Sequence, residues 1–150
     1  MSELQDRNKA IVRRFNEEFI QNGNLDIYDE IVSPDFHNHT AHDGRTPGPD
    51  GARYFFTQVL RPAFPDIRVT IHDQFAEGDV VVTRKSYEAT HKGPFMGVPA
   101  TAKRIGFAVI DIIRLRDGKY VEHWANADMM GLMQQLKGAP GPDLTAGAGA

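Results

Sequence analysis

The sequence contains no cysteine among its 150 residues. Disulfide frameworks, thiolate metal sites and cysteine nucleophiles are therefore excluded. It also lacks any apolar run approaching the ~18–20 residues that a membrane-spanning helix needs. Residues 1–8 are polar and mixed in charge, without the apolar stretch of a secretory signal peptide. We therefore expect a cytoplasmic protein with no membrane partner.

The chain has little excess charge, with 17 Lys and Arg residues against 20 Asp and Glu residues and a formal net charge of -3. This balance argues against nucleic acid as a partner. The sequence has no glycine-rich phosphate loop, no dinucleotide fingerprint, no GxSxG serine elbow and no HExxH zinc helix. Nucleotide-dependent and serine-hydrolase chemistry therefore have no support.

The composition, 41% hydrophobic and 25% charged, is typical of a soluble globular domain. The last twelve residues are rich in Gly, Ala and Pro and contain a single leucine. Such a segment has too little apolar surface to pack firmly. We expect one domain over residues 1–138, followed by a flexible tail over residues 139–150.

Helical and strand periods divide the domain into two parts. Apolar residues recur every three or four positions over residues 4–20, 25–31 and 49–60, which predicts three amphipathic helices. Gly23 and Pro34 are expected to end the first two of these helices. Apolar and polar residues then alternate over residues 67–72, 80–91, 103–116 and 120–128, which predicts four strands.

The order of these elements favours an α+β fold. Asp117 and Gly118 predict a tight hairpin turn between the last two strands, and residues 129–136 predict a short closing helix. Helices that come first and antiparallel strands that follow indicate N-terminal helices packed on a curved, mostly antiparallel sheet. Helices and a curved sheet packed in this way form a cone, which encloses a cavity suited to an apolar or aromatic small molecule.

The most informative segment for function is residues 120–128. Alternation places Glu122, Trp124, Asn126 and Asp128 on one face of the strand. The other face carries Val121, His123, Ala125 and Ala127, and either face could be the inner one. A carboxylate beside Trp124 and away from water would have a raised pKa, suited to general acid/base catalysis. Alternatively, or in addition, Asp128 caps the helix that follows.

A second polar cluster contains His37, His39 and His42. Two of these histidines could share one face of an extended segment, so a metal site is conceivable. Their spacing matches no specific metal motif, and we assign no metal. We place His39 in the candidate pocket, and the alternative is a loop that faces solvent.

Two charged residues on the predicted strands have more than one interpretation. Arg84 either lines the pocket, where it could hold a carboxylate or an enolate, or forms a solvated face with Glu88. Asp111 interrupts an apolar row, which is costly unless the carboxylate is paired. It lies at a sheet edge or dimer face, or it is a second functional carboxylate.

Four segments together resemble the SnoaL-like polyketide cyclases of the NTF2-like and ketosteroid-isomerase-like superfamily. They are Pro34-Asp-Phe-His-Asn-His39, Phe64-Pro-Asp66, the loop from Ala89 to Pro99, and the stretch from Asp117 to Leu136 with Glu122-His-Trp124, Asp128 and Gln134-Gln-Leu136. Each segment is weak alone, but their order and spacing are fairly specific for the family. The resemblance covers residues 5–138. One loop departs from it, because Ala100-Thr-Ala-Lys103 stands where relatives often have Pro-Thr-Gly-Lys.

The resemblance implies a cone-shaped NTF2-like barrel, usually a homodimer, with a deep pocket and no cofactor or metal. It also implies an intramolecular aldol condensation that closes a ring, with the aspartate after the last tryptophan as acid/base. Asp128 matches that aspartate, and His39 joins it in our candidate catalytic set. The candidate pocket lining is Trp124, His91, Asn126, Arg84, Phe15, Phe19 and Phe56.

Three alternatives remain open at this point. The same fold could act as an epoxide hydrolase or isomerase, if Arg84, Asp111 and Asp128 converge to activate water. It could be a non-catalytic protein that binds a small molecule. It could also be an interaction domain whose cavity is filled by side chains, because one fold hosts many functions.

Overall fold

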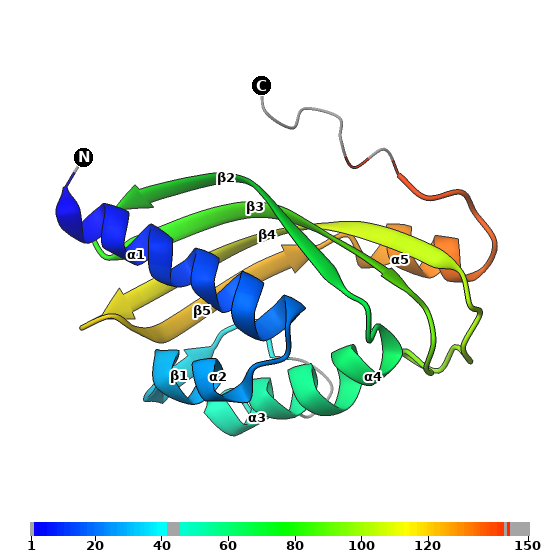
Figure 1. Ribbon diagram of the computed structural model, residues 1–150, viewed down its shortest axis with the longest axis horizontal. Helices are drawn as coiled ribbons and strands as arrows, with labels where there is room; N and C mark the ends of the chain where they lie inside the picture. Colours follow the sequence, from blue (N-terminus) through cyan, green and yellow to red (C-terminus); the bar gives the residue numbers. More distant parts are fainter. Residues whose placement is uncertain (1, 42–45, 143, 145–150) are drawn as a thin grey trace.

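A computed structural model describes residues 2–41, 46–142 and 144 of the chain. Helices pack across one side of a strongly curved five-stranded sheet, as Figure 1 shows. The helices are α1 (Glu3–Arg14), η1 (Phe15–Gln21), α2 (Leu25–Ile31), α3 (Pro49–Tyr54), η2 (Phe55–Leu60), α4 (Arg61–Ala63) and α5 (Met129–Leu136). The strands are β1 (Val32–Asn38), β2 (Arg68–Glu77), β3 (Val80–Thr90), β4 (Arg104–Arg116) and β5 (Lys119–Ala127). The predicted α+β class is confirmed.

The helix boundaries follow local capping rules. The Ser2 side chain accepts a hydrogen bond from the backbone N–H of Gln5, and the Gln5 side chain accepts one from Ser2 in return. Gly23 has φ of 75°, the left-handed conformation that ends a helix. Asn24 then caps α2 through the N–H of Asp26. The predicted end of the first helix is confirmed.

The first and third predicted helices each continue into a π-helical segment. η1 extends α1, and η2 extends α3. π-helical turns are rare and occur frequently at functional sites. Helical periodicity does not predict them.

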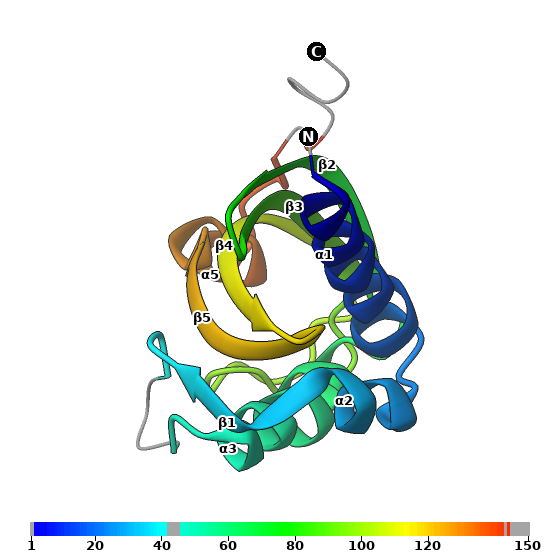
Figure 2. The same cartoon turned by 90° about the vertical axis from the view of Figure 1, so that its left-hand side faces the viewer.

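The sheet has the strand order β1-β5-β4-β3-β2. Strands β2 to β5 pair antiparallel, as predicted, and the positive φ values of Asp117 (53°) and Gly118 (76°) form the predicted hairpin turn. Strand β1 was not predicted, and it pairs in parallel with β5. The sheet is therefore mixed, and Figure 2 shows how it curves around the space that faces the helices.

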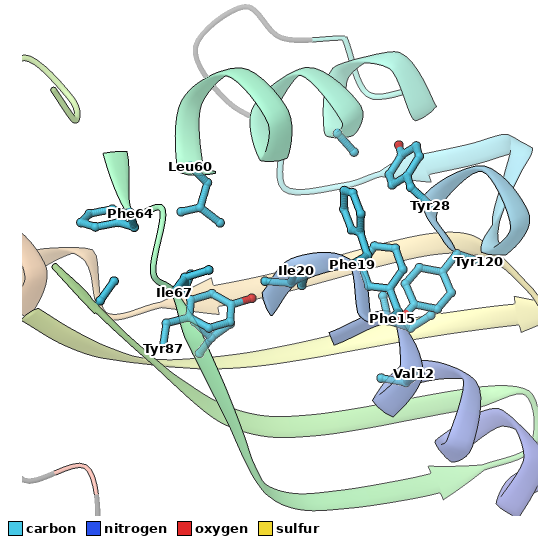
Figure 3. Close-up of a cluster of buried hydrophobic side chains, with 14 of the residues drawn as sticks. Val12, Phe15, Phe19, Ile20, Tyr28, Leu60, Phe64, Ile67, Tyr87 and Tyr120 are labelled. Carbon is cyan, nitrogen blue, oxygen red and sulfur yellow. The ribbon is translucent and has the colours of Figure 1, made fainter. Parts of the chain in front are cut away.

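The hydrophobic core lies between the helices and the concave face of the sheet. Figure 3 shows Phe15 and Phe19 of η1 beside Tyr28 and Tyr120. The ring centres of Phe15 and Tyr120 are 4.6 Å apart, and those of Phe19 and Tyr28 are 5.0 Å apart. Aromatic contacts at such distances add to the stability gained from burial alone. They fix η1 against α2 and β5 and so define one end of the interior.

Two predictions concern the chain beyond this core. Among the described residues, no helix combines the length and the apolarity that a membrane crossing requires. The cytoplasmic location stays a prediction. The flexible tail was predicted for residues 139–150, of which 143 and 145–150 lie outside the described residues, as does His42.

Candidate active site

A cavity of about 510 Å³ lies between the helices and the concave face of the sheet. This volume falls within the range of sites for small organic ligands. Its walls are mostly apolar and include Phe15, Phe36, Phe55, Phe56, Tyr87, Phe107 and Tyr120. Exposed lining residues, among them Thr46, Met96 and Asn126, mark the opening. The open cavity contradicts an interaction domain whose interior is filled by side chains.

The structure shows which face of β5 is the inner one. His123, Ala125 and Ala127 line the cavity, whereas Trp124 does not. On the outer side, the indole ring of Trp124 stacks on His39 with ring centres 4.5 Å apart and an interplanar angle of 7°. The His39 ring also lies 2.9 Å from Glu122. The stacked pair is therefore placed outside the cavity lining.

Asp128 acts as the N-cap of α5. Its Oδ1 accepts a hydrogen bond of 2.9 Å from the backbone N–H of Gly131, and the residue is exposed. The predicted capping role is confirmed. Asp128 is not among the residues that line the cavity.

Of the remaining residues predicted to line the pocket, some line the cavity and others are buried in the surrounding core. Phe15, Phe56 and Asn126 line the cavity. Phe19 is buried in the aromatic core beside it, and His91 is buried against Phe64 with Nδ1 accepting a hydrogen bond from the Thr101 N–H.

Arg84 points away from the cavity, since its strand neighbour Lys85 lines it. Its guanidinium binds Asp73 with distances of 2.7 Å and 2.6 Å. Arg84 and Asp128 therefore lie outside the cavity lining, whereas Asp111 is part of it. The set of Arg84, Asp111 and Asp128 expected for an epoxide hydrolase is not assembled.

A buried ion pair instead forms the most polar part of the cavity wall. Lys85 Nζ lies 2.7 Å from Asp111 Oδ2, and the two side chains are only 3% and 7% exposed. Lys85 also donates a hydrogen bond of 2.7 Å to Oδ1 of Asn16. Asn16 donates in turn to the carbonyl of Val12, which fixes the orientation of its amide. Asp111 is thus neither an edge residue nor surface exposed.

One oxygen of this pair has no partner. Oδ1 of Asp111 is buried and forms no hydrogen bond with any described residue. A buried carboxylate oxygen without a hydrogen-bond donor destabilises the folded state, because it has lost its contacts with water. Such an unpaired oxygen is uncommon and indicates a functional role or an unseen partner. Asp111 is one of the residues that line the cavity, so this oxygen lies close to the space that a ligand would occupy.

The pair also shapes the protonation of its neighbours. Burial, the largest single influence, lowers the pKa of Lys85, but the adjacent Asp111 carboxylate and Tyr87 together outweigh it and raise the pKa, so the ammonium stays charged. Burial raises the pKa of two of the tyrosines in the wall, Tyr87 and Tyr120, which therefore stay protonated. Burial lowers the pKa of His123 to about 4, only partly opposed by Asp111.

Two of the histidines expected to be able to share a metal site lie side by side near the end of β1. The rings of His37 and His39 are 4.5 Å apart. In residues 2–41 and 46–142, however, no three His, Asp or Glu side chains gather closely enough to hold a metal ion.

The model of the SnoaL-like polyketide cyclases matches residues 10–136. The chain belongs to this family. A candidate SnoaL-like polyketide cyclase from Jannaschia sp. CCS1 is 26% identical, with a TM-score of 0.83 over 93% of this chain and 98% of that one. IdmH, a candidate polyketide cyclase from Streptomyces antibioticus, is 30% identical, with a TM-score of 0.76 over 87% and 98% of the chains.

A further structural relative has a different assigned chemistry. AclR, a candidate hydroxylase from Streptomyces galilaeus, is 29% identical, with a TM-score of 0.77 over 91% of this chain and 99% of that chain. No curated protein matches the chain in sequence. The family is thus established, and the reaction must be argued from the cavity itself.

The decisive polar residues were only partly visible in the sequence. Asp111 was singled out because it interrupts an apolar row. Lys85 carries the same signal, since it lies between Thr83 and Tyr87 on the inner face of β3, but it is absent from the candidates drawn from the sequence. Asn16 gave no signal, because its neighbours Phe15 and Phe19 dominate the helical pattern.

Proposed function

We propose that this chain closes a ring in a polyketide-type substrate by intramolecular aldol condensation, with Asp111 as the acid/base. The observation that supports this assignment is Oδ1 of Asp111, which has no hydrogen-bond partner among the described residues and belongs to the wall of a mostly apolar cavity. Asp128, the acid/base candidate from sequence, has its carboxylate engaged with Gly131 at the start of α5. The proposal therefore assigns proton transfer to Asp111.

The first step is removal of a proton from a carbon activated by neighbouring carbonyl groups. Oδ1 of Asp111 takes the proton, and the C–H bonding electrons become the enolate. Lys85 holds the other carboxylate oxygen at 2.7 Å and keeps the carboxylate in one orientation. As Asp111 becomes neutral, the Lys85 ammonium stabilises the negative charge that has moved to the substrate.

The second step forms the new carbon–carbon bond. The enolate carbon attacks a second carbonyl carbon of the same molecule, and the electron pair of that C=O bond moves to its oxygen. The protonated Asp111 then returns its proton to this oxygen, which restores the carboxylate. The phenol groups of Tyr87 and Tyr120, held protonated by burial, are available as hydrogen-bond donors to the developing oxyanion.

The apolar walls suit this reaction. Aromatic residues from η1, η2 and β4, such as Phe15, Phe56 and Phe107, surround the cavity. They would fold a flexible, partly aromatic chain so that the two reacting carbons meet, which can lower the barrier by several kcal/mol. The proposed steps use side chains of the protein alone.

The proton-transfer step can be tested without the natural substrate. 2-Tetralone, a bicyclic ketone of suitable size, has exchangeable C–H groups beside its carbonyl. We expect the protein to accelerate deuterium uptake at these positions in D₂O above the buffer rate, as followed by NMR. If the ketone binds and its exchange is not accelerated, the cavity belongs to a non-catalytic binding protein instead.

A further inference from the structure

The structure fixes the tautomer of His123, the histidine in the cavity lining. Oδ1 of Asn38 accepts a hydrogen bond of 3.0 Å from the backbone N–H of Thr40 and one of 2.9 Å from its hydroxyl. This atom must therefore be the amide oxygen, since an amide nitrogen cannot accept from a backbone N–H. His123 Nδ1 lies 2.8 Å from the same oxygen. Because an oxygen cannot donate here, Nδ1 carries the proton.

The other ring nitrogen is consequently a hydrogen-bond acceptor. With Nδ1 protonated and the ring neutral, Nε2 presents a lone pair. Within the described ranges, the ring's hydrogen bonds are to Asn38 and Thr40, and both involve Nδ1. His123 lines the cavity, two positions along β5 from Ala125, the cross-strand partner of Asp111. The residue that carries this acceptor nitrogen therefore lines the same cavity as Asp111.

We infer that His123 Nε2 accepts a hydrogen bond from a hydroxyl group of the ligand, so that the cavity selects substrates with a free phenol or enol O–H. Asn38 acts as the positioning residue that keeps His123 in this tautomer. This inference rests on the proposed function only in that both place the ligand in the same cavity. It adds the chemical class of the ligand, a hydroxylated aromatic or enolised polyketide.

The physical basis of the selection is the cost of an unpaired polar atom. A site built to bond a substrate hydroxyl rejects an analogue without that proton, because its own acceptor is then left unpaired. A methyl ether has the same oxygen but no proton to donate. Its extra methyl group would also point toward the imidazole ring of His123. O-methylation or glycosylation of this hydroxyl must therefore follow the step catalysed here, and the reaction that supplies the substrate must leave the hydroxyl free.

The test compares 2-naphthol with 2-methoxynaphthalene, which differ by one methyl group on the oxygen. Histidine side chains are labelled with ¹⁵N, and the His123 signals are assigned by their loss in His123→Leu. We expect a protonated Nδ1 and a bare Nε2 in the free protein at neutral pH. 2-Naphthol should shift the Nε2 resonance and bind about tenfold or more tightly than the ether, while the ether leaves that resonance in place.

Variants separate positioning from mere packing. Asn38→Leu should give a mixture of His123 tautomers and reduce the preference for naphthol. Asn38→Asp should keep Nδ1 protonated, because a carboxylate oxygen still accepts from it, and should restore the preference. His37→Gln, at an exposed neighbouring position of β1, is the matched control and should change neither reading.

Several results would overturn the inference. These are an Nε2-protonated tautomer in the free protein, equal binding of the two probes, and no binding of naphthol up to its solubility. A preference for naphthol that survives in His123→Leu but disappears in Asp111→Asn would assign the acceptor to Asp111 instead. Because binding and tautomer are read without turnover, loss of the deuterium-exchange activity alone would refute the proposed function and leave this inference standing.

Discussion

Lys85 and Asp111 form an ion pair with a 2.7 Å separation on neighbouring strands of the inner sheet face, almost wholly shielded from solvent. Pairs of this kind gain little net stability, since desolvation of both charges offsets their attraction. Retaining a charged pair in the wall of an apolar cavity is consistent with a functional rather than a stabilising role. This relationship leads to the first prediction.

Replacing one member of the ion pair should destabilise the fold more than replacing both. Lys85→Met leaves the Asp111 carboxylate buried without a counter-charge, so we expect a loss of about 3–5 kcal/mol in the free energy of unfolding. The double variant Lys85→Met/Asp111→Leu should recover much of that loss, as measured by urea denaturation. Equal destabilisation of the single and double variants would show that the charge pair is not coupled as described.

The lowered pKa of His123 predicts that the free energy of unfolding decreases at acidic pH. The unfolded chain binds a proton to this histidine near pH 6.5, but the folded chain does so only near pH 4. The contribution of His123 to the free energy of unfolding is therefore fully present above pH 6.5. It is lost as the pH is lowered from 6.5 to 4, by up to about 3 kcal/mol. Urea denaturation between pH 4 and 7 should show a shallower fall in His123→Gln than in the wild type. Parallel curves would contradict a neutral, buried His123, with His37→Gln as the exposed control.

The cap on α5 can be tested through stability alone. Asp128→Ala should reduce the free energy of unfolding by about 1 kcal/mol, because the N–H of Gly131 loses its acceptor. Asp128→Asn should be nearly neutral, since asparagine caps equally well. Comparable losses in both variants would show that the carboxylate contributes more than the cap.

The homodimer implied by the family resemblance stays a prediction, and the outer sheet face offers a place for it. Phe75, Val82, Ile112 and Trp124 are successive cross-strand partners from β2 to β5, and Phe75 is 63% exposed. Light scattering coupled to size-exclusion chromatography should give the mass of two chains, and Phe75→Lys should shift it toward one. A wild-type mass of one chain would contradict the prediction.

The fold could be predicted from the sequence because its signals are local. The helical and alternating periods, the glycine at position 23 and the Asp117-Gly118 turn each determine a nearby backbone conformation. Strand β1 was missed because its pairing with β5 joins residues more than eighty positions apart. Its proline, Pro34, indicated only the end of a helix.

The candidate site was harder to predict, because the alternation of a strand defines two faces without showing which is buried. Trp124 and its polar neighbours form the face of β5 that carries the most polar functional groups. The cavity instead meets the plainer face with His123 and Ala125. Lys85 and Asn16 contact each other across 69 positions, a relationship that no spacing within the sequence expresses.

The central claim, that Asp111 is the acid/base, is tested most directly by paired substitutions. The rate of deuterium uptake by 2-tetralone is measured for wild type, Asp111→Asn and Asp128→Asn, with folding checked by thermal unfolding. We expect Asp111→Asn to reduce the protein-catalysed rate by about 10²–10⁴-fold, the usual contribution of a general base, while Asp128→Asn changes it by less than about tenfold. A large loss in Asp128→Asn with little change in Asp111→Asn would contradict the account and return the acid/base role to Asp128.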